Sequence, residues 1–290
     1  MVSPGVSRVA VIGAGTMGHG IAQVAAMAGY ETVLCDVDAA QLDRAMARIE
    51  ATLDKGVRLG KVAEATRDGA LARLETAAGA AEASRGAHLV IEAVPEVMEL
   101  KQRILSEVEA SVEDGTVLAT NTSSLSVSQM AAALRLPGRF MGLHFFNPVH
   151  IMELVEVVDG EHTHLRARNR AMWFVKKLGK EAIQVADSPG FASSRLGIVL
   201  GLEAIRMVES GVASPEDIDK AMVLGYRHPM GPLRLTDLVG LDVRLDIARY
   251  LYESLGSEAF RPPGLLERMV ADGRLGKKTG QGFYDWPDES

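Results

Sequence analysis

The sequence is poor in cysteine and in long apolar runs. Its single cysteine, Cys35, can form no disulfide within the chain and no multi-thiolate zinc site, which is consistent with a reducing compartment. No segment reaches the roughly 18 consecutive apolar residues that a membrane helix needs. The first strand-like run begins at Arg8, which leaves no room before it for a signal peptide. We therefore expect a cytoplasmic protein that does not cross a membrane.

Positive charge is also in deficit. The chain has 38 acidic and 31 basic side chains, a formal net charge of -7, and no basic block. An acidic protein repels a phosphate backbone, so nucleic acid is not an expected partner. The sequence also contains no His-Glu-x-x-His, paired-cysteine or clustered-carboxylate pattern, and we expect no metal site.

The 290 residues, 47% of them hydrophobic and 24% charged, are enough for two globular domains. In the first half, short apolar runs alternate with helical stretches, and most runs are continuous rather than alternating. A sheet covered by helices on both faces needs such strands. The pattern predicts an α/β fold with a doubly wound parallel sheet of the Rossmann type. The expected strands are 9–12, 32–35, 89–93, 117–120, 140–144, 154–158 and 182–185.

Strand signals stop near Ser188, and the rest of the chain is predicted to be helical. We expect domains at 1–187 and 188–290, with a charged helical excursion from the sheet at about 39–83, interrupted by glycines. Apolar residues between Leu196 and Val208 form a broad helical face. The sequence leaves open whether this face is a dimer interface or the core of the second domain.

A dinucleotide motif follows the first expected strand. Gly13, Gly15 and Gly18 form G-x-G-x-x-G between a strand and a helix, where they suit a tight turn, a close approach of backbone to pyrophosphate, and close helix packing. Asp36 ends the second strand, where a carboxylate accepts hydrogen bonds from a ribose 2′-hydroxyl and repels a 2′-phosphate. NAD is favoured over NADP, since the nearest downstream arginine is Arg44. The motif alone does not distinguish NAD from FAD.

One histidine stands out among seven. His144 ends an apolar run at the expected carboxyl edge of the sheet, where ligands bind. Twelve residues later, Glu156 interrupts the apolar run Leu154 to Val158, and a carboxylate is costly to bury without a partner. A carboxylate bonded to one ring nitrogen would leave the other ready to take a proton. The spacing fits this pair and a structural ion pair equally well.

Together, these residues resemble the NAD-dependent L-3-hydroxyacyl-CoA dehydrogenases, including the bacterial 3-hydroxybutyryl-CoA dehydrogenases. The resemblance covers nearly the whole chain. It rests on Gly13 to Gly18, Asn121 to Ser124, His144 to Pro148, Glu156, Pro189 to Phe191, His228 to Pro232 and Gly276 to Tyr284.

The resemblance implies that His144 is the general base for a 3-hydroxyl, supported by Glu156, while hydride passes to NAD. It implies that Ser123 and Asn147 lie beside substrate and cofactor, although turn chemistry alone explains such residues. Two further positions, Glu96 and Lys101, match residues that contact the nicotinamide-side ribose. From the sequence alone they form an ordinary solvated start of a helix. The resemblance also suggests a homodimer formed through the helical domain.

The substrate side of the resemblance is less complete. Many family members have Asn-Arg two residues after Pro-Gly-Phe, whereas here Ser194 precedes Arg195. A serine is shorter, so we expect a water-mediated or relocated contact with the thioester side. For coenzyme A, Thr52 and Lys61 in the helical excursion are the candidate contacts.

The expected reaction is the reversible oxidation of a short-chain (S)-3-hydroxyacyl-CoA by NAD. A relative on the same fold that oxidises a sugar acid or carnitine would keep Asp36, His144 and Glu156 but need no contacts with coenzyme A. A non-catalytic NAD-binding protein would keep the fold alone. Intact His144, Glu156 and Ser123 argue against that third possibility.

Overall fold

A computed structural model describes residues 6–287 of the chain. The chain divides into two compact units, the first ending at Ser188 and the second beginning at Pro189. Each unit has its own cluster of buried apolar side chains. No helix among the described residues is long and apolar enough to cross a membrane.

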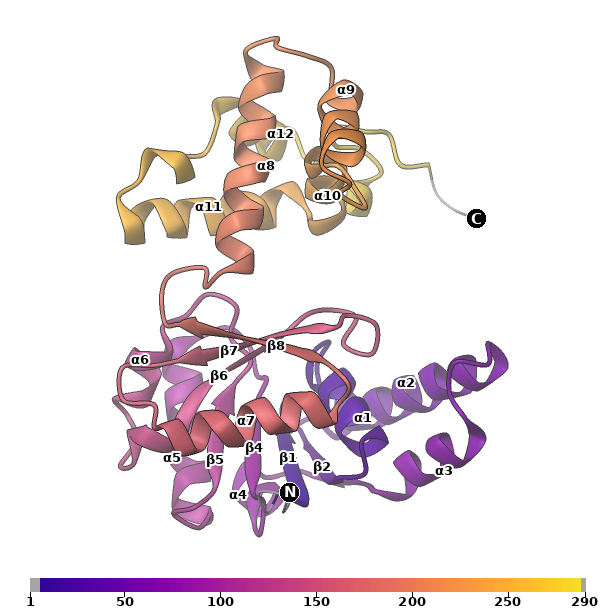
Figure 1. Cartoon of the computed structure of the whole chain (residues 1–290), viewed down its shortest axis with the longest axis vertical. Helices are drawn as coiled ribbons and strands as arrows, with labels where there is room; N and C mark the ends of the chain where they lie inside the picture. The colour runs from indigo at the N-terminus through magenta and orange to yellow at the C-terminus, as the bar shows by residue number, and fades with distance from the viewer. Residues whose placement is uncertain (1–5, 288–290) are drawn as a thin grey trace. The chain divides into compact units, whose positions relative to one another are not determined.

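The first unit is built on one eight-stranded sheet with helices on both of its faces (Figure 1). Its strands are β1 (Arg8–Ile12), β2 (Glu31–Cys35), β3 (Leu74–Ala77), β4 (Leu89–Glu92), β5 (Val117–Thr120), β6 (Phe140–Phe145), β7 (Leu154–Asp159) and β8 (Glu181–Ala186). Its α-helices are α1 (Gly18–Met27), α2 (Ala39–Arg58), α3 (Glu64–Ala72), α4 (Ala80–Ser84), α5 (Met98–Ser111), α6 (Val127–Ala131) and α7 (Leu165–Lys177).

The strand order is β3-β2-β1-β4-β5-β6-β7-β8. The first six strands run parallel in the order of a dinucleotide-binding sheet, so the doubly wound Rossmann-type fold is confirmed. β7 pairs antiparallel with β6, and β8 runs parallel to β7. The sheet is therefore mixed and mainly parallel, and the parallel arrangement that the sequence predicts holds for its first six strands.

The prediction of a helical excursion at 39–83 is partly wrong, because this segment contains β3 at the edge of the sheet. Of the glycines expected to interrupt it, Gly56 lies inside α2 and Gly69 inside α3. Only Gly60, with a φ of 66°, lies between the two helices.

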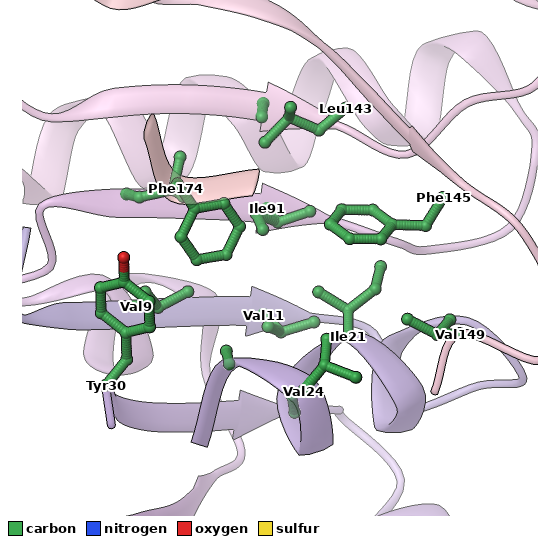
Figure 2. Close-up of a cluster of buried hydrophobic side chains, with 14 of the residues drawn as sticks. Val9, Val11, Ile21, Val24, Tyr30, Ile91, Leu143, Phe145, Val149 and Phe174 are labelled. Carbon is green, nitrogen blue, oxygen red and sulfur yellow. The ribbon is translucent and has the colours of Figure 1, made fainter. Parts of the chain in front are cut away.

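Side chains from both ends of the chain's first unit meet on one face of the sheet (Figure 2). Val9 and Val11 of β1 pack there with Ile21 of α1 and Phe174 of α7, and all four are fully buried. Because successive side chains of a strand point to opposite faces, Ala10 and Ile12, which are also buried, face the other side. Burial on both faces explains why the strands are continuous apolar runs.

The second unit is helical, as the sequence predicts. It contains α8 (Ser193–Glu209), α9 (Pro215–Lys220), α10 (Pro232–Val239), α11 (Leu241–Leu255) and α12 (Gly264–Ala271). The apolar face between Leu196 and Val208 is mostly core, since Leu202, Ala204 and Ile205 are buried within this unit. Leu196 alone remains well exposed, at 68%.

Candidate functional site

At two positions of the turn between β1 and α1, close contacts within the protein require glycine. Gly13 has a φ of 105°, and a Cβ there would lie 2.6 Å from the carbonyl oxygen of Ala93. A Cβ on Gly18 would overlap the carbonyl oxygen of Gly13. These two glycines let the start of α1 pack directly on the ends of β1 and β4.

Gly15 differs from its two neighbours. A Cβ built there meets no atom within 4 Å, and the residue lines a cleft. None of the residues that the structure describes requires glycine at this position, so the space is available to a ligand that approaches the backbone. The N-terminus of α1 follows directly and presents unsatisfied N–H groups and a partial positive charge, which suits a pyrophosphate.

Asp36 fastens this turn to β2. Its Oδ2 accepts a hydrogen bond from the Ala14 backbone N–H at 2.9 Å, and its Oδ1 accepts one from Asp38 at 3.0 Å. The carboxylate lines the cleft and retains lone pairs for a ribose hydroxyl. Arg44 pairs instead with Asp38, at 3.1 Å.

The cleft has a volume of about 1020 Å³ and runs along the carboxyl ends of the central strands. Ligands in open α/β sheets bind along this edge, where the strand order reverses between β1 and β4. Predicted site residues from distant parts of the chain meet there. Those lining the cleft are Gly13, Gly15, Asp36, Glu96, Lys101, Ser123, His144 and Asn147.

His144 and Glu156 lie directly opposite each other in the antiparallel pair of β6 and β7. The Nδ1 of His144 is 2.7 Å from Oε2 of Glu156. The histidine is 6% exposed and lines the cleft, while the glutamate is fully buried behind it. A carboxylate only accepts hydrogen bonds, so Nδ1 carries the proton and Nε2 is the ring nitrogen suited to exchange one with a ligand.

Two neighbouring loops carry the other polar groups of this end of the cleft. Ser123 follows β5 and is exposed, and Asn147 follows β6 and is also exposed. Asn121 joins the loop after β5 to the end of β6, since its Oδ1 accepts a hydrogen bond from the Phe145 backbone N–H at 2.9 Å. The ring of Phe146 packs against that of His144, with centroids 4.5 Å apart.

Lys101 is not a solvated helix residue. Its side chain is 1% exposed, and its Nζ lies 2.7 Å from Oε1 of Glu92 and 3.2 Å from Oε2 of Glu96. Burial by itself would raise the pKa of Glu96, but Lys101 and the hydrogen bond from Thr122 outweigh it and hold that pKa below its ordinary value.

Glu92 was missed as a candidate by the sequence reasoning. It is the last residue of β4 and is fully buried. Its signal was available, because it is a carboxylate at the end of an apolar strand, as Glu156 is one inside an apolar strand.

The remaining candidates lie outside the lining of the cleft. Thr52 is in α2, and the exposed Lys61 lies just beyond its end. Ser194 is in the first turn of α8, in the second unit. Their contact with a substrate stays a prediction. Across residues 6–287, no group of three or more His, Cys, Asp or Glu side chains is placed to hold a metal ion.

Two family models match the chain. Residues 8–188 match the NAD binding domain of 3-hydroxyacyl-CoA dehydrogenase, and residues 190–286 match the C-terminal domain of the same enzyme.

Individual relatives match over nearly the full length. A 3-hydroxybutyryl-CoA dehydrogenase of Mycobacterium tuberculosis is 45% identical, over 98% of this chain and 100% of the relative. A 3-hydroxyadipyl-CoA dehydrogenase of Escherichia coli is 41% identical over 98% of this chain but only 60% of its own length. The crystal structure of (S)-3-hydroxybutyryl-CoA dehydrogenase from Ralstonia eutropha is similar with a TM-score of 0.94 at 38% identity, covering 98% of this chain and 100% of that one.

Proposed function

The chain belongs to the 3-hydroxyacyl-CoA dehydrogenase family, and from this premise we propose that it interconverts short-chain (S)-3-hydroxyacyl-CoA and 3-oxoacyl-CoA esters, with His144 as the proton-transfer group. Membership makes the chain an NAD-dependent oxidoreductase acting on 3-hydroxyacyl-CoA. It disfavours the non-CoA substrate and the non-catalytic role that the residues alone left open. The proposal adds the acyl-chain length and the assignment of individual residues.

The observation that carries the residue assignment is the 2.7 Å contact between His144 and Glu156 at the wall of the cleft. In the oxidation, Nε2 of His144 takes the proton of the substrate's 3-hydroxyl, and the buried carboxylate of Glu156 stabilises the imidazolium that forms. In the reduction, the imidazolium returns the proton. Such proton transfer contributes roughly 10²- to 10⁴-fold to the rate.

The residues of the cleft fit a bound NAD. The space above Gly15 and the N-terminus of α1 suit the pyrophosphate, and Asp36 suits the adenosine ribose. Bound nicotinamide supplies the acceptor for the hydride from C3 of the substrate. Ser123 and Asn147, which lie at the His144 end of the cleft, orient the two reacting groups through their hydroxyl and amide.

The short-chain preference rests on relatives named 3-hydroxybutyryl-CoA dehydrogenase that are 40% to 45% identical to this chain. The first unit is proposed to hold NAD, and the second to contribute to the acyl-CoA site. We also propose a homodimer formed through the second unit. Four of its apolar side chains, Leu235, Leu238, Val239 and Val243, are 40% to 43% exposed.

Nicotinamide absorbance during reduction of acetoacetyl-CoA tests the proposal. We expect rapid oxidation of NADH, far slower oxidation of NADPH, and a loss of at least about 10²-fold in kcat for His144→Ala. A series of 3-oxoacyl-CoA esters of increasing length then tests the preference, with kcat/KM expected to be highest at four carbons. Turnover of longer esters alone would contradict the short-chain assignment, and no competition by free coenzyme A would contradict the CoA site.

A further inference from the structure

Glu92 is a buried charged group with no role in the reaction described so far. Its carboxylate lies beneath the floor of the cleft and accepts four hydrogen bonds at 2.6–3.0 Å: two from Lys101, and one each from Thr120 and the Val94 backbone N–H. Burial raises its pKa, and the ammonium of Lys101 opposes that shift and favours the ionised form. A fully bonded buried carboxylate of this kind fixes the position of whatever it binds.

Lys101 connects the fixed carboxylate of Glu92 to residues that line the cleft. Besides its bonds to Glu92, its Nζ donates to the Val94 carbonyl at 3.2 Å and pairs with Oε2 of Glu96 at 3.2 Å. An ammonium group has three protons, and these partners account for all of them. Lys101 is therefore held in one place and holds Glu96 in turn.

The other carboxylate oxygen of Glu96, Oε1, binds the turn that contains Ser123. Oε1 accepts hydrogen bonds from the Thr122 hydroxyl at 2.5 Å, from the backbone N–H of Ser123 at 3.1 Å and from that of Ser124 at 3.2 Å. The turn from Thr122 to Ser124 thus has a carboxylate as its centre. Its position depends on where Lys101 places that carboxylate.

We propose that Glu92 is a positioning residue that acts through Lys101 and Glu96 to set the Thr122–Ser124 turn, and with it Ser123, against the cleft. This inference rests on the proposed function, which assigns Ser123 to the reacting end of the cleft. The ammonium of Lys101 is shared between the carboxylates of Glu92 and Glu96, and this shared contact fixes the distance between the two carboxylates. A neutral residue at 92 leaves Glu96 as the only carboxylate partner of Lys101, which draws Glu96 away from the turn.

The test is Glu92→Gln, which keeps the size of the side chain and removes its charge. We expect kcat for acetoacetyl-CoA to fall about tenfold, KM for the acyl-CoA to stay within about twofold, and the Kd for NADH, from fluorescence titration, to rise about threefold or more. The fall in kcat without a matching change in KM is the informative readout. If the Glu92–Lys101 pair were purely structural, its loss would change neither kcat nor KM at temperatures where the protein is folded.

Glu109→Gln is the matched control. Glu109 lies on α5, as Lys101 does, and like Glu92 it forms a buried ion pair, with Arg139 at 3.1 Å, but it is outside the lining of the cleft. Both variants should have a lower Tm, and only Glu92→Gln should have altered kcat and Kd. If Glu92→Gln matches Glu109→Gln in kcat and in Kd, the positioning role is wrong.

Thr120→Val covers the case in which Glu92→Gln does not fold. It removes a single hydrogen bond from Glu92, and a fall of a few fold in kcat supports the inference, while unchanged kcat and Kd refute it. If the wild-type chain reduces no 3-oxoacyl-CoA ester, the proposed function fails separately. The NADH titration of the same variants then decides the positioning role by itself.

Discussion

Glu156 is a charged residue in the interior of an apolar strand. Its neighbours Val155, Val157 and Val158 are all buried, and the carboxylate itself is fully inaccessible to solvent. A buried carboxylate is tolerated only with strong hydrogen-bond partners, and His144 provides one at 2.7 Å. The same contact fixes which ring nitrogen faces the cleft.

Replacing Glu156 with Gln tests this role. The amide occupies the same volume and keeps a hydrogen bond to Nδ1, but it no longer stabilises an imidazolium. We expect kcat to fall by about 10²-fold with KM changed far less, because the lost interaction belongs to the transition state. Steady-state kinetics with acetoacetyl-CoA and NADH measures both, and an unchanged kcat would remove Glu156 from the mechanism.

The sequence predicted some of these residues and not others, for physical reasons. A charge inside an apolar strand is visible in the sequence, so Glu156 and its partner His144 could be identified. Lys101 was identified only through the resemblance, and its burial was not foreseen, because it lies in a helix start rich in polar residues and is buried against Glu92, nine residues earlier at the end of β4. Burial of a helical lysine is a tertiary property that no local pattern shows.

The turn between β1 and α1 shows how an element combines demands of folding and of binding. Gly13 and Gly18 are required by contacts within the protein, whereas Gly15 faces open space. The sequence motif shows a glycine at all three positions and does not distinguish why each is required. The structure does.

Two alanine substitutions distinguish these reasons. Gly15→Ala should leave the Tm within about 2 °C of the wild type, since the added methyl meets nothing, but weaken NADH binding by about tenfold. Gly18→Ala should destabilise the folded state by about 1–3 kcal/mol or more, because its methyl overlaps a backbone carbonyl.

Thermal unfolding and NADH titration of both variants provide the measurements. Tight NADH binding by Gly15→Ala would mean that no ligand approaches the backbone at that point. A Gly18→Ala variant as stable as the wild type would mean that the start of α1 can move away from β1.

Strand prediction found every strand except β3, which lies at one edge of the sheet. β3 is only four residues long, and Glu75 and Thr76 are exposed, so Leu74–Ala77 has no apolar run to mark it. The direction of β7 was also unpredicted. Its apolar run is the same whether it lies parallel or antiparallel to β6, since direction is determined by the connection and not by composition.

At the scale of the whole molecule, each unit has its own hydrophobic core and its own buried hydrogen bonds. In the second unit, the buried carboxylate of Asp237 accepts hydrogen bonds from the backbone N–H groups of Phe283 and Tyr284 and from the Trp286 side chain, all at 2.9 Å. These bonds hold the C-terminal segment to α10. The residues that line the cleft all belong to the first unit.

Asp237→Ala should therefore affect stability without affecting the cleft. Each buried donor left unpaired costs about 1–3 kcal/mol, so we expect the Tm to fall by at least about 5 °C while the Kd for NADH stays unchanged. Asp217→Asn, which alters an exposed pair with Lys220, serves as the control and should change the Tm little. A weaker affinity for NADH in the folded Asp237→Ala variant would show that the cleft depends on the second unit.

The close opposition of His144 and Glu156 on β6 and β7 also bears on how this chemistry is inherited. The cleft proposed to hold NAD draws on residues from Ile12 to Asn147, in segments that come together only when the sheet is complete. The proposed proton-transfer pair, by contrast, lies on two consecutive strands and is separated by only twelve residues. One short stretch of gene thus encodes both members, so recombination would transmit them or lose them together.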